Sequence, residues 1–216
     1  GNSGNPTVNG TPNIYKEIYA GVAKLDIHFR ELSELEADNI DAIRPQLLSI
    51  EGRAADSYWQ MVKLILEGKQ EFKGRERRGA QDPVNSALNY GYGMLYTNIW
   101  GAIVLAGLDP FAGFMHVDRP GKPSLVLDLI EEFRQQVVDR VVIAMLQKGT
   151  EIEVKEGKLT DKTRKTLIGK FKDRLEATES FDGRKLAIKS IIQRQARRIA
   201  SFLRGEGKYK AFIGKW

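Results

Sequence analysis

The stretch from Val84 to Leu105 constrains the fold of this chain more than any other segment. Its sequence, VNSALNYGYGMLYTNIWGAIVL, is apolar on nearly every face of a helix. A helix without a polar face has to be surrounded by other elements, so we expect it at the centre of the core. Asp82 or Asn85 is a candidate cap for its first turn. Because the chain lacks a run of about 18 consecutive apolar residues, we expect no membrane span.

Amphipathic segments precede and follow this apolar one. Residues 14–35 carry apolar side chains at positions 14, 18, 22, 25, 29 and 32, the period of a helix of about six turns. Pro45 indicates the start of a second helix. Ser124 is a candidate cap of a later helix, and Thr160 or Asp161 of another. Since neither repeats nor alternating strands and helices occur, we expect a mostly α fold, a multi-helix bundle with one minor β-hairpin. The elements expected after residue 105 are helices over 125–146, 161–178 and 183–203, and a hairpin within 151–160.

Positive charge is concentrated at the C-terminal end. The chain has a net charge of +6, but residues 184–216 alone hold ten Lys and Arg against one acid, Glu206. A basic segment on a slightly acidic body predicts a face that binds a polyanion. The alternative is the solvated side of an ordinary helix, since charge reports on association rather than on fold.

Acidic residues interrupt the apolar run SLVLDLIEEFR (124–134). Asp128 and Glu131 are spaced i, i+3, so they lie on one face of the predicted helix, one turn apart. Two carboxylates beside that much apolar surface are costly unless a cation compensates them. Arg134 can do so if both acids simply face solvent, and this interpretation stays open. Glu51 raises the same question on the second helix, where its neighbours on the face are mainly apolar.

A divalent metal ion is the other explanation for these acids. Glu51, His116, Asp128 and Glu131 supply carboxylate and imidazole ligands without sulfur, a set that suits Mg²⁺ or Mn²⁺. A metal ion beside a basic surface implies phosphodiester chemistry. Cysteine is absent, which excludes disulfides and thiolate metal sites and suits an intracellular, cytoplasmic protein. Other templates fit poorly, because no GxxxxGK[ST], GxSxG or HExxH motif occurs.

Five blocks of sequence, taken in order, resemble a known family. The blocks are SIEGRAADSYW (49–59), DPVNSALNYGYGMLY (82–96), GLDPFAGFMH (107–116), SLVLDLIEEFR (124–134) and IIQRQARRIASFLRGEGKYKAF (191–212). They resemble the helical catalytic domain of the CRISPR-associated integrases, the first-numbered Cas family. The resemblance implies a metal-dependent catalytic domain over residues 13–216. Residues 1–12, rich in Gly, Asn and Pro, are expected to be a flexible leader or linker remnant.

The resemblance also implies an activity and a set of site residues. The family inserts short DNA fragments into a CRISPR array, which is spacer acquisition, and has metal-dependent DNA endonuclease activity. Matched motif by motif, it implies that Glu51, His116 and Glu131 hold Mg²⁺ or Mn²⁺, with Asp128 as an additional catalytic acid. The third ligand is often Asp in the family, and whether Asp128 or Glu131 touches the metal stays open.

Partners follow from the same resemblance. It implies double-stranded DNA, as spacer precursor and CRISPR repeat, a homodimer, and the second-numbered Cas protein as a partner. The family's N-terminal β-rich domain, which supports homodimerisation, is missing from this sequence, so we expect weaker DNA binding and dimerisation. The alternatives are a non-catalytic DNA-binding or scaffold module of the same fold, and a related integrase from a mobile element.

Basic side chains are candidates for holding the DNA backbone, because phosphate contacts position DNA without reading its sequence. The stretch NYGYG (89–93) has two interpretations: glycines in the core that let helices approach, or Asn89 or Tyr90 lining the metal pocket. The DNA-binding candidates are Arg75, Arg77, Arg78, Lys122, Arg194, Arg197 and Arg198.

Overall fold

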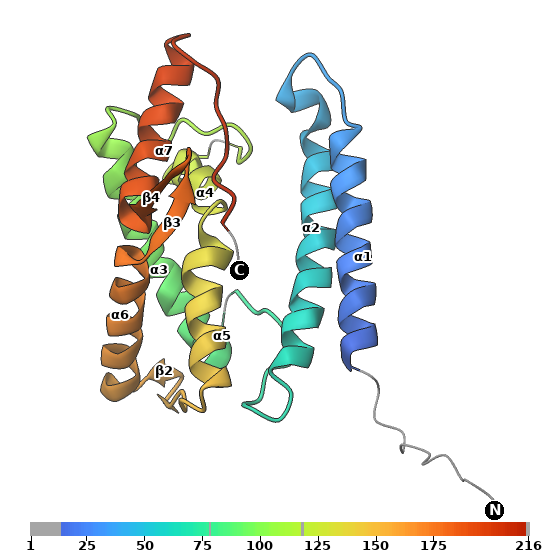
Figure 1. Ribbon diagram of the computed structural model, residues 1–216, viewed down its shortest axis with the longest axis vertical. Coiled ribbons are helices and arrows are strands. Elements are labelled where there is room, and N and C mark those ends of the chain that lie inside the picture. The colour runs from blue at the N-terminus through green and yellow to red at the C-terminus, as the bar shows by residue number, and fades with distance from the viewer. Residues whose placement is uncertain (1–13, 78, 118, 215–216) are drawn as a thin grey trace, which may run out of the picture. The chain divides into compact units, whose positions relative to one another are not determined.

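Helices dominate the computed structural model, which describes residues 14–77, 79–117 and 119–214. The chain divides into two compact units, residues 1–67 and 68–216, and each is described by itself. The described residues form α-helices, one π-helix and two small antiparallel sheets, so the predicted mostly α fold with minor β structure is confirmed (Figure 1). Every helix within these ranges is too short or too polar to cross a bilayer. The predicted leader, residues 1–12, lies outside the described residues.

The N-terminal unit is a pair of antiparallel helices, α1 (Ile14–Ser33) and α2 (Ile40–Ile65) (Figure 1). The two helices approach closely at Gly21, where an added Cβ would lie 2.6 Å from the Sδ atom of Met61. The prediction that the second helix starts at Pro45 is wrong, because α2 begins five residues earlier. Asn39 caps it by accepting a hydrogen bond from the backbone N–H of Ala42 at 3.1 Å, and Pro45 lies inside the helix.

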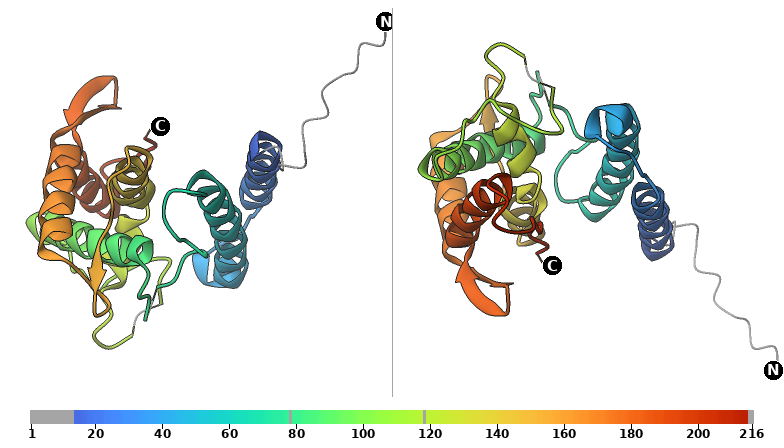
Figure 2. Two further views of the ribbon diagram at one scale, coloured as in Figure 1. Left: turned by 90° about the horizontal axis from the view of Figure 1, so that it is seen from below. Right: turned by 90° about the horizontal axis from the view of Figure 1, so that it is seen from above.

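In the C-terminal unit, α3 (Pro83–Leu105) packs against every other helix, as its apolar sequence predicts, while Thr97, Asn98 and Leu105 on it are exposed (Figure 2). Asp82 is the cap, accepting from the Asn85 backbone N–H at 2.9 Å. The helices that follow α3 in the sequence pack on it, which leaves Leu95, Ile99 and many of its other apolar side chains buried. These surrounding helices are α4 (Ser124–Ile130), the π-helix η1 (Arg134–Asp139), α5 (Arg140–Gln147), α6 (Asp161–Glu176) and α7 (Ile188–Leu203).

The single helix predicted over 125–146 is interrupted in the structure. It consists of α4, a turn, the π-helix η1 and α5. Ser124 does not cap α4 with its side chain. Its hydroxyl instead accepts from the Gly113 N–H at 2.9 Å and donates to the Phe111 carbonyl, tying the preceding loop to the helix. Interruptions of this kind are common at functional sites.

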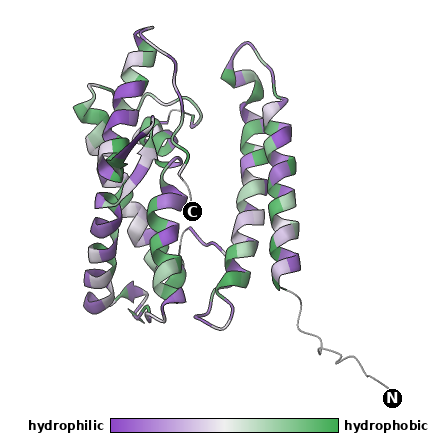
Figure 3. Ribbon diagram, in the orientation of Figure 1, coloured by the Kyte–Doolittle hydropathy of each residue, from purple (hydrophilic) through white to green (hydrophobic). Residues whose placement is uncertain are grey.

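Two hairpins complete the unit. The predicted one is confirmed as β1 (Val154–Lys155) paired with β2 (Lys158–Leu159). Of the two candidate caps of α6, Thr160 is the cap and Asp161 is the first residue of the helix. The second, β3 (Thr178–Phe181) with β4 (Arg184–Ala187), replaces the predicted start of the last helix at residue 183. Its turn, Asp182-Gly183, has two left-handed residues at φ 48° and 75°, the geometry of a tight hairpin turn. Figure 3 colours much of α6 as hydrophilic, in keeping with its many exposed charged residues.

Candidate functional site

The loop between α3 and α4 delivers His116, and Asp128 on α4 holds that loop in place. Oδ2 of Asp128 accepts from the backbone N–H groups of Phe114 at 2.5 Å and Met115 at 3.0 Å. Oδ1 accepts from the backbone N–H of His116 at 3.0 Å. Gly113 makes this wrap possible, because an added Cβ there would lie 2.8 Å from Oδ2 of Asp128. The carboxylate therefore acts as an anchor for three successive N–H groups.

The same carboxylate orients the imidazole. Nδ1 of His116 lies 2.6 Å from Oδ1 of Asp128, with side chains that are 22% and 12% exposed. A carboxylate acceptor at Nδ1 favours the tautomer that carries its proton there, which leaves Nε2 as the atom with a lone pair. Histidines that bind metals are held in this way by a carboxylate on the other nitrogen. The arrangement fits His116 as a ligand and Asp128 as the residue that orients it.

Glu131 is the neighbouring acid and has a different environment. It forms an ion pair with Arg134 at 2.7 Å, and the two side chains are 33% and 24% exposed. This pair is the cationic compensation that the sequence left open as an alternative. Because Asp128 is committed to the loop, Glu131 is the better placed of the two acids to offer oxygen to an ion.

A buried network lies behind Arg134. Its guanidinium carbon is 4.9 Å from the centre of the Tyr92 ring, and the Tyr92 hydroxyl donates to the buried carboxylate of Asp139. Burial raises the pKa of Tyr92, and the neighbouring Asp139 carboxylate raises it further. Tyr92 therefore remains a neutral donor that ties α3 to the π-helix.

Arg75 belongs to this network rather than to an open surface. It donates to Oδ1 of Asn85 at 3.0 Å and to Oδ1 of Asn89 at 2.6 Å, and lies 5.1 Å from the Tyr92 ring centre. Loss of solvation lowers the pKa of Arg75 from its usual value. Its predicted DNA contact thus competes with contacts inside the unit. Asn89 takes part in the same network, as a partner of Arg75.

The other predicted DNA-binding residues have varied settings. Arg194 and Arg197 are exposed on α7, Arg77 is exposed in the loop before α3, and Lys122 is half-buried beside the His116 loop. Arg198 is engaged internally: it pairs with Asp182 and donates to the Lys210 carbonyl at 2.9 Å. Arg78 lies outside the described residues.

Sequence reasoning missed the role of Glu132. Its carboxylate accepts from Nε2 of Gln195 at 2.7 Å, from the Phe212 N–H at 2.9 Å, and from the Tyr209 hydroxyl. Burial and the Glu132 carboxylate raise the pKa of Tyr209. The acid pins the C-terminal tail against α4 and α7. The doubled EE in the sequence was the available signal, since adjacent helical acids face different directions.

The predicted metal ligands are brought together only in part. His116 and Asp128 are in contact, and Glu131 is one helical turn from Asp128. Glu51 is exposed on α2, in the N-terminal unit, so its approach to His116 stays a prediction. Within the described ranges, no three His, Asp or Glu side chains form a preassembled metal site. The donor types present, one imidazole and carboxylates, nevertheless suit Mn²⁺ or Mg²⁺.

An apolar pocket of about 280 Å³ adjoins Asp128. It is bounded by Phe114 of the loop and by Ile199, Phe202 and Tyr209 of α7 and the tail. The loop that carries His116 thus borders a cavity large enough to admit a small group.

Comparison with known proteins places these features in context. Residues 10–173 match the family model described as CRISPR associated protein Cas1. The chain is 40% identical over 220 residues to the CRISPR-associated endonuclease Cas1 1 of Archaeoglobus fulgidus, covering 96% of this chain but only 64% of that relative. A casposase bound to an integration product is 27% identical with a TM-score of 0.72, over 91% of this chain and 64% of that one. A Cas6-RT-Cas1–Cas2 complex is 18% identical with a TM-score of 0.68, over 92% and 25%, a likeness of fold.

Proposed function

The chain belongs to the family of the CRISPR associated protein Cas1, and on that premise we propose that it is the catalytic part of a metal-dependent DNA integrase and endonuclease. The substrates would be a short double-stranded DNA, the spacer precursor, and the CRISPR repeat that accepts it. The relative from Archaeoglobus fulgidus is described as an endonuclease, and the structurally similar casposase was captured with an integration product.

The reaction is a transesterification. The 3′-hydroxyl oxygen of the incoming DNA forms a new bond to phosphorus, and the bond between that phosphorus and the oxygen of the repeat strand breaks. One phosphodiester replaces another, so no nucleotide triphosphate is needed, in keeping with the absence of a P-loop motif. Nuclease activity is the same displacement with water as the nucleophile.

The contact between Asp128 and His116 carries the proposal. A histidine held at Nδ1 by a carboxylate, on a loop whose three N–H groups are bound by that carboxylate, is a preorganised ligand. Nε2 of His116, Glu131 and Glu51 would hold the Mg²⁺ or Mn²⁺ ion. When bound, the ion would stabilise negative charge on the phosphate and favour ionisation of the attacking group.

Arg134 has a supporting role in this scheme. It neutralises Glu131 in the absence of the ion, and its stacking on Tyr92 retains it when the carboxylate turns to another cation. A partly exposed ion pair contributes little to stability, so releasing it costs little. Glu131 is therefore able to exchange partners.

Basic side chains would bind the DNA backbone. The exposed or partly exposed candidates are Arg77, Lys122, Arg194 and Arg197. We further propose that the protein is cytoplasmic and acts as a homodimer. We also propose the second-numbered Cas protein as its partner, because the complex of similar fold contains Cas1 and Cas2. The likeness to the casposase supports a second candidate, a mobile-element integrase. Target preference separates the two, because only the first should favour a CRISPR repeat as acceptor.

The test is DNA nicking and strand transfer with Mn²⁺, comparing the wild type with Glu51→Gln. Asp56→Asn is the matched control, being an exposed acid on the same helix with the same change of charge. We expect Glu51→Gln to lose nearly all activity and Asp56→Asn to keep it. Equal behaviour of the wild type and Glu51→Gln would favour the non-catalytic DNA-binding module instead.

A further inference from the structure

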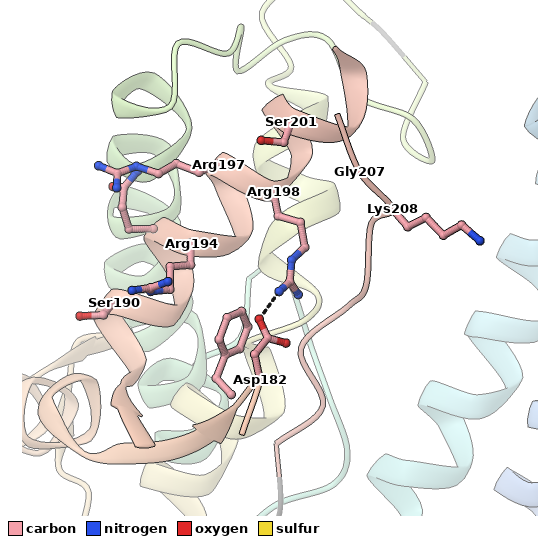
Figure 4. Close-up of a pocket in the computed structure, with 10 residues that line it drawn as sticks. Asp182, Ser190, Arg194, Arg197, Arg198, Ser201, Gly207 and Lys208 are labelled. Carbon is pink, nitrogen blue, oxygen red and sulfur yellow. Dashed lines mark hydrogen bonds and ion pairs between the residues drawn. The ribbon is translucent and has the colours of Figure 1, made fainter. Parts of the chain in front are cut away.

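The pocket drawn in Figure 4 lies along α7, and its lining residues come from outside the loop that carries His116. It has a volume of about 600 Å³ and is bounded by α7, the turn between β3 and β4, and the C-terminal tail. Its charged and hydroxyl-bearing residues are Asp182, Ser190, Arg194, Arg197, Arg198, Ser201 and Lys208. This composition suits an anion, provided that the one acid is neutralised.

Four of these residues form a stripe, here called the α7 track: Ser190, Arg194, Arg197 and Ser201. Their spacing of four, three and four places them on one face of the helix. They extend over about 16 Å, since each helical residue rises 1.5 Å. Figure 4 shows them in succession along α7. A stripe of this length is too long for one phosphate and suits several consecutive ones.

The cations of the α7 track have no ion-pair partner among the described residues. Arg194 and Arg197 are both exposed. They are one turn apart, and like charges at this spacing repel each other. An anion lying between them would remove that repulsion, and a guanidinium is well shaped to bind phosphate oxygens.

Arg198 and Asp182 cancel each other. Arg198 pairs with Asp182, lies 4.8 Å from the centre of the Phe181 ring, and donates to Gln195 and to the Lys210 carbonyl. Figure 4 shows it turned away from Arg194 and Arg197, toward Asp182. The acid therefore does not repel an anion on the α7 track, and Arg198 positions the hairpin and tail.

The α7 track and the apolar pocket beside Asp128 lie on different sides of α7. Ile199 and Phe202 line that apolar pocket. At 100° per residue, Ile199 points about 160° away from Arg197 around the helix axis. A DNA strand on the α7 track therefore lies on a different side of α7 from the apolar pocket that the loop of His116 borders.

We propose that the α7 track binds consecutive backbone phosphates of a DNA segment remote from the phosphate that reacts. The inference rests on the proposed function for its ligand class. It adds that the C-terminal unit has two separate DNA contacts: one at the reacting bond, and one that binds the DNA backbone without taking part in the reaction. Guanidinium and hydroxyl groups contact phosphates without reading bases, so binding at the α7 track is independent of the DNA sequence.

The first test is binding of a long DNA duplex in EDTA, which separates holding from catalysis. The variant is Arg194→Gln/Arg197→Gln, and the matched control is Lys165→Gln/Lys172→Gln, two exposed residues of α6 with the same loss of charge. We expect the log–log salt slope of the first variant to be less steep by about 1.8, the value for two phosphates on B-DNA. The control should keep the wild-type slope to within a fraction of that difference. Arg194→Lys/Arg197→Lys should retain most of the slope, because the charge is kept.

The second test is nicking with Mn²⁺ on duplexes of two lengths. On a duplex of about one helical turn, roughly 10 base pairs, Arg194→Gln/Arg197→Gln should have the wild-type kcat, and its KM should rise less than it does on a long duplex. On a long duplex the variant should have a raised KM and an unchanged kcat. A 5′-phosphorylated duplex should bind no better than an unphosphorylated one, and a preference for phosphorylated ends that the variant loses would overturn the track in favour of an end site.

The outcomes separate the inference from the function on which it rests. If the wild type binds and nicks DNA but the arginine variant matches the lysine control on both lengths, the track is refuted and the proposed function stands. Loss of kcat on the short duplex also refutes it, because the arginines then act at the reacting bond. A wild type that neither binds nor nicks DNA refutes both.

Discussion

Replacing Asp128 with asparagine tests the assignment of its carboxylate as an anchor. Oδ2 accepts two backbone N–H groups, and Oδ1 accepts a third together with Nδ1 of His116. An asparagine retains one acceptor oxygen and presents an NH₂ group to the other two donors. A donor left without an acceptor costs about 1–3 kcal/mol, and the side chain is mostly buried, so we expect a loss of roughly 2–4 kcal/mol in the free energy of unfolding.

The same substitution should weaken metal binding without removing a ligand. Loss of a carboxylate that orients a metal-binding histidine typically costs about 10–100-fold in metal affinity. Chemical denaturation measures the first effect, and Mn²⁺ titration followed by electron paramagnetic resonance measures the second. Glu131→Gln is the comparison: its ion pair with Arg134 is partly exposed, so the free energy of unfolding should change by less than about 1 kcal/mol while Mn²⁺ affinity falls.

The reasoning is refuted if Asp128→Asn keeps the wild-type stability and loses Mn²⁺ binding altogether. That combination would make Asp128 the direct ligand and the contacts with the loop incidental. Equal destabilisation by Asp128→Asn and Glu131→Gln would also contradict the division of roles between the two acids.

Three further outcomes are expected. The pKa of Tyr92 is raised in the folded protein, which therefore keeps a proton that the unfolded chain loses above pH 10. The free energy of unfolding should be unaffected by this group below pH 10 and should fall above it by up to about 1.4 kcal/mol per pH unit. Tyr92→Phe should make this alkaline fall, measured by denaturation, less steep. Glu132→Gln should release the tail, seen as faster hydrogen exchange of the amides of 205–212, and unchanged exchange there would contradict the pinning. Gly91→Ala should lower the free energy of unfolding by about 1–3 kcal/mol because the added Cβ would lie 2.6 Å from a valine of the π-helix, whereas Gly93→Ala, with open space around it, should be neutral or stabilising.

Apolar pattern, cap residues and turn residues predicted the elements that depend on the local sequence. The apolar stretch around Leu95 identified the central helix, Thr160 identified the start of α6, and the Gly turn within 151–160 identified a hairpin. The second hairpin was missed although Asp182-Gly183 is a strong turn signal, because the basic helix pattern after it was extended one turn too far. Helix boundaries depend on caps, and Asn39 outweighed the proline at position 45 in setting where α2 begins.

The site could be predicted by residue type but not by the role of each residue. Asp128, Glu131 and Glu132 are alike in sequence, and their roles differ because each contacts a different partner: the His116 loop, Arg134, and the C-terminal tail. Those partners lie 12 residues before, 3 after and 80 after the acid they contact, so only the fold assigns them. Sequence spacing alone predicts a shared face. Of the two interpretations of the acids, compensation by Arg134 is observed for Glu131, and the metal ion stays a prediction. The contact of Asp128 with His116 was not predicted.

The π-helix explains how Glu131 is linked to the core. Arg134 and Asp139 are five residues apart, and in an α-helix they would point about 140° away from each other. Hydrogen bonding from i to i+5 brings such residues to one side, and both then reach Tyr92, Arg134 over its ring and Asp139 at its hydroxyl. Gly91, beside Tyr92 on α3, allows the π-helix to approach that closely. Because Arg134 is held by Tyr92 and in turn holds Glu131, the position of the exchangeable acid is determined by a buried tyrosine on the central helix, and the irregular segment belongs to the site rather than being a defect of the helix.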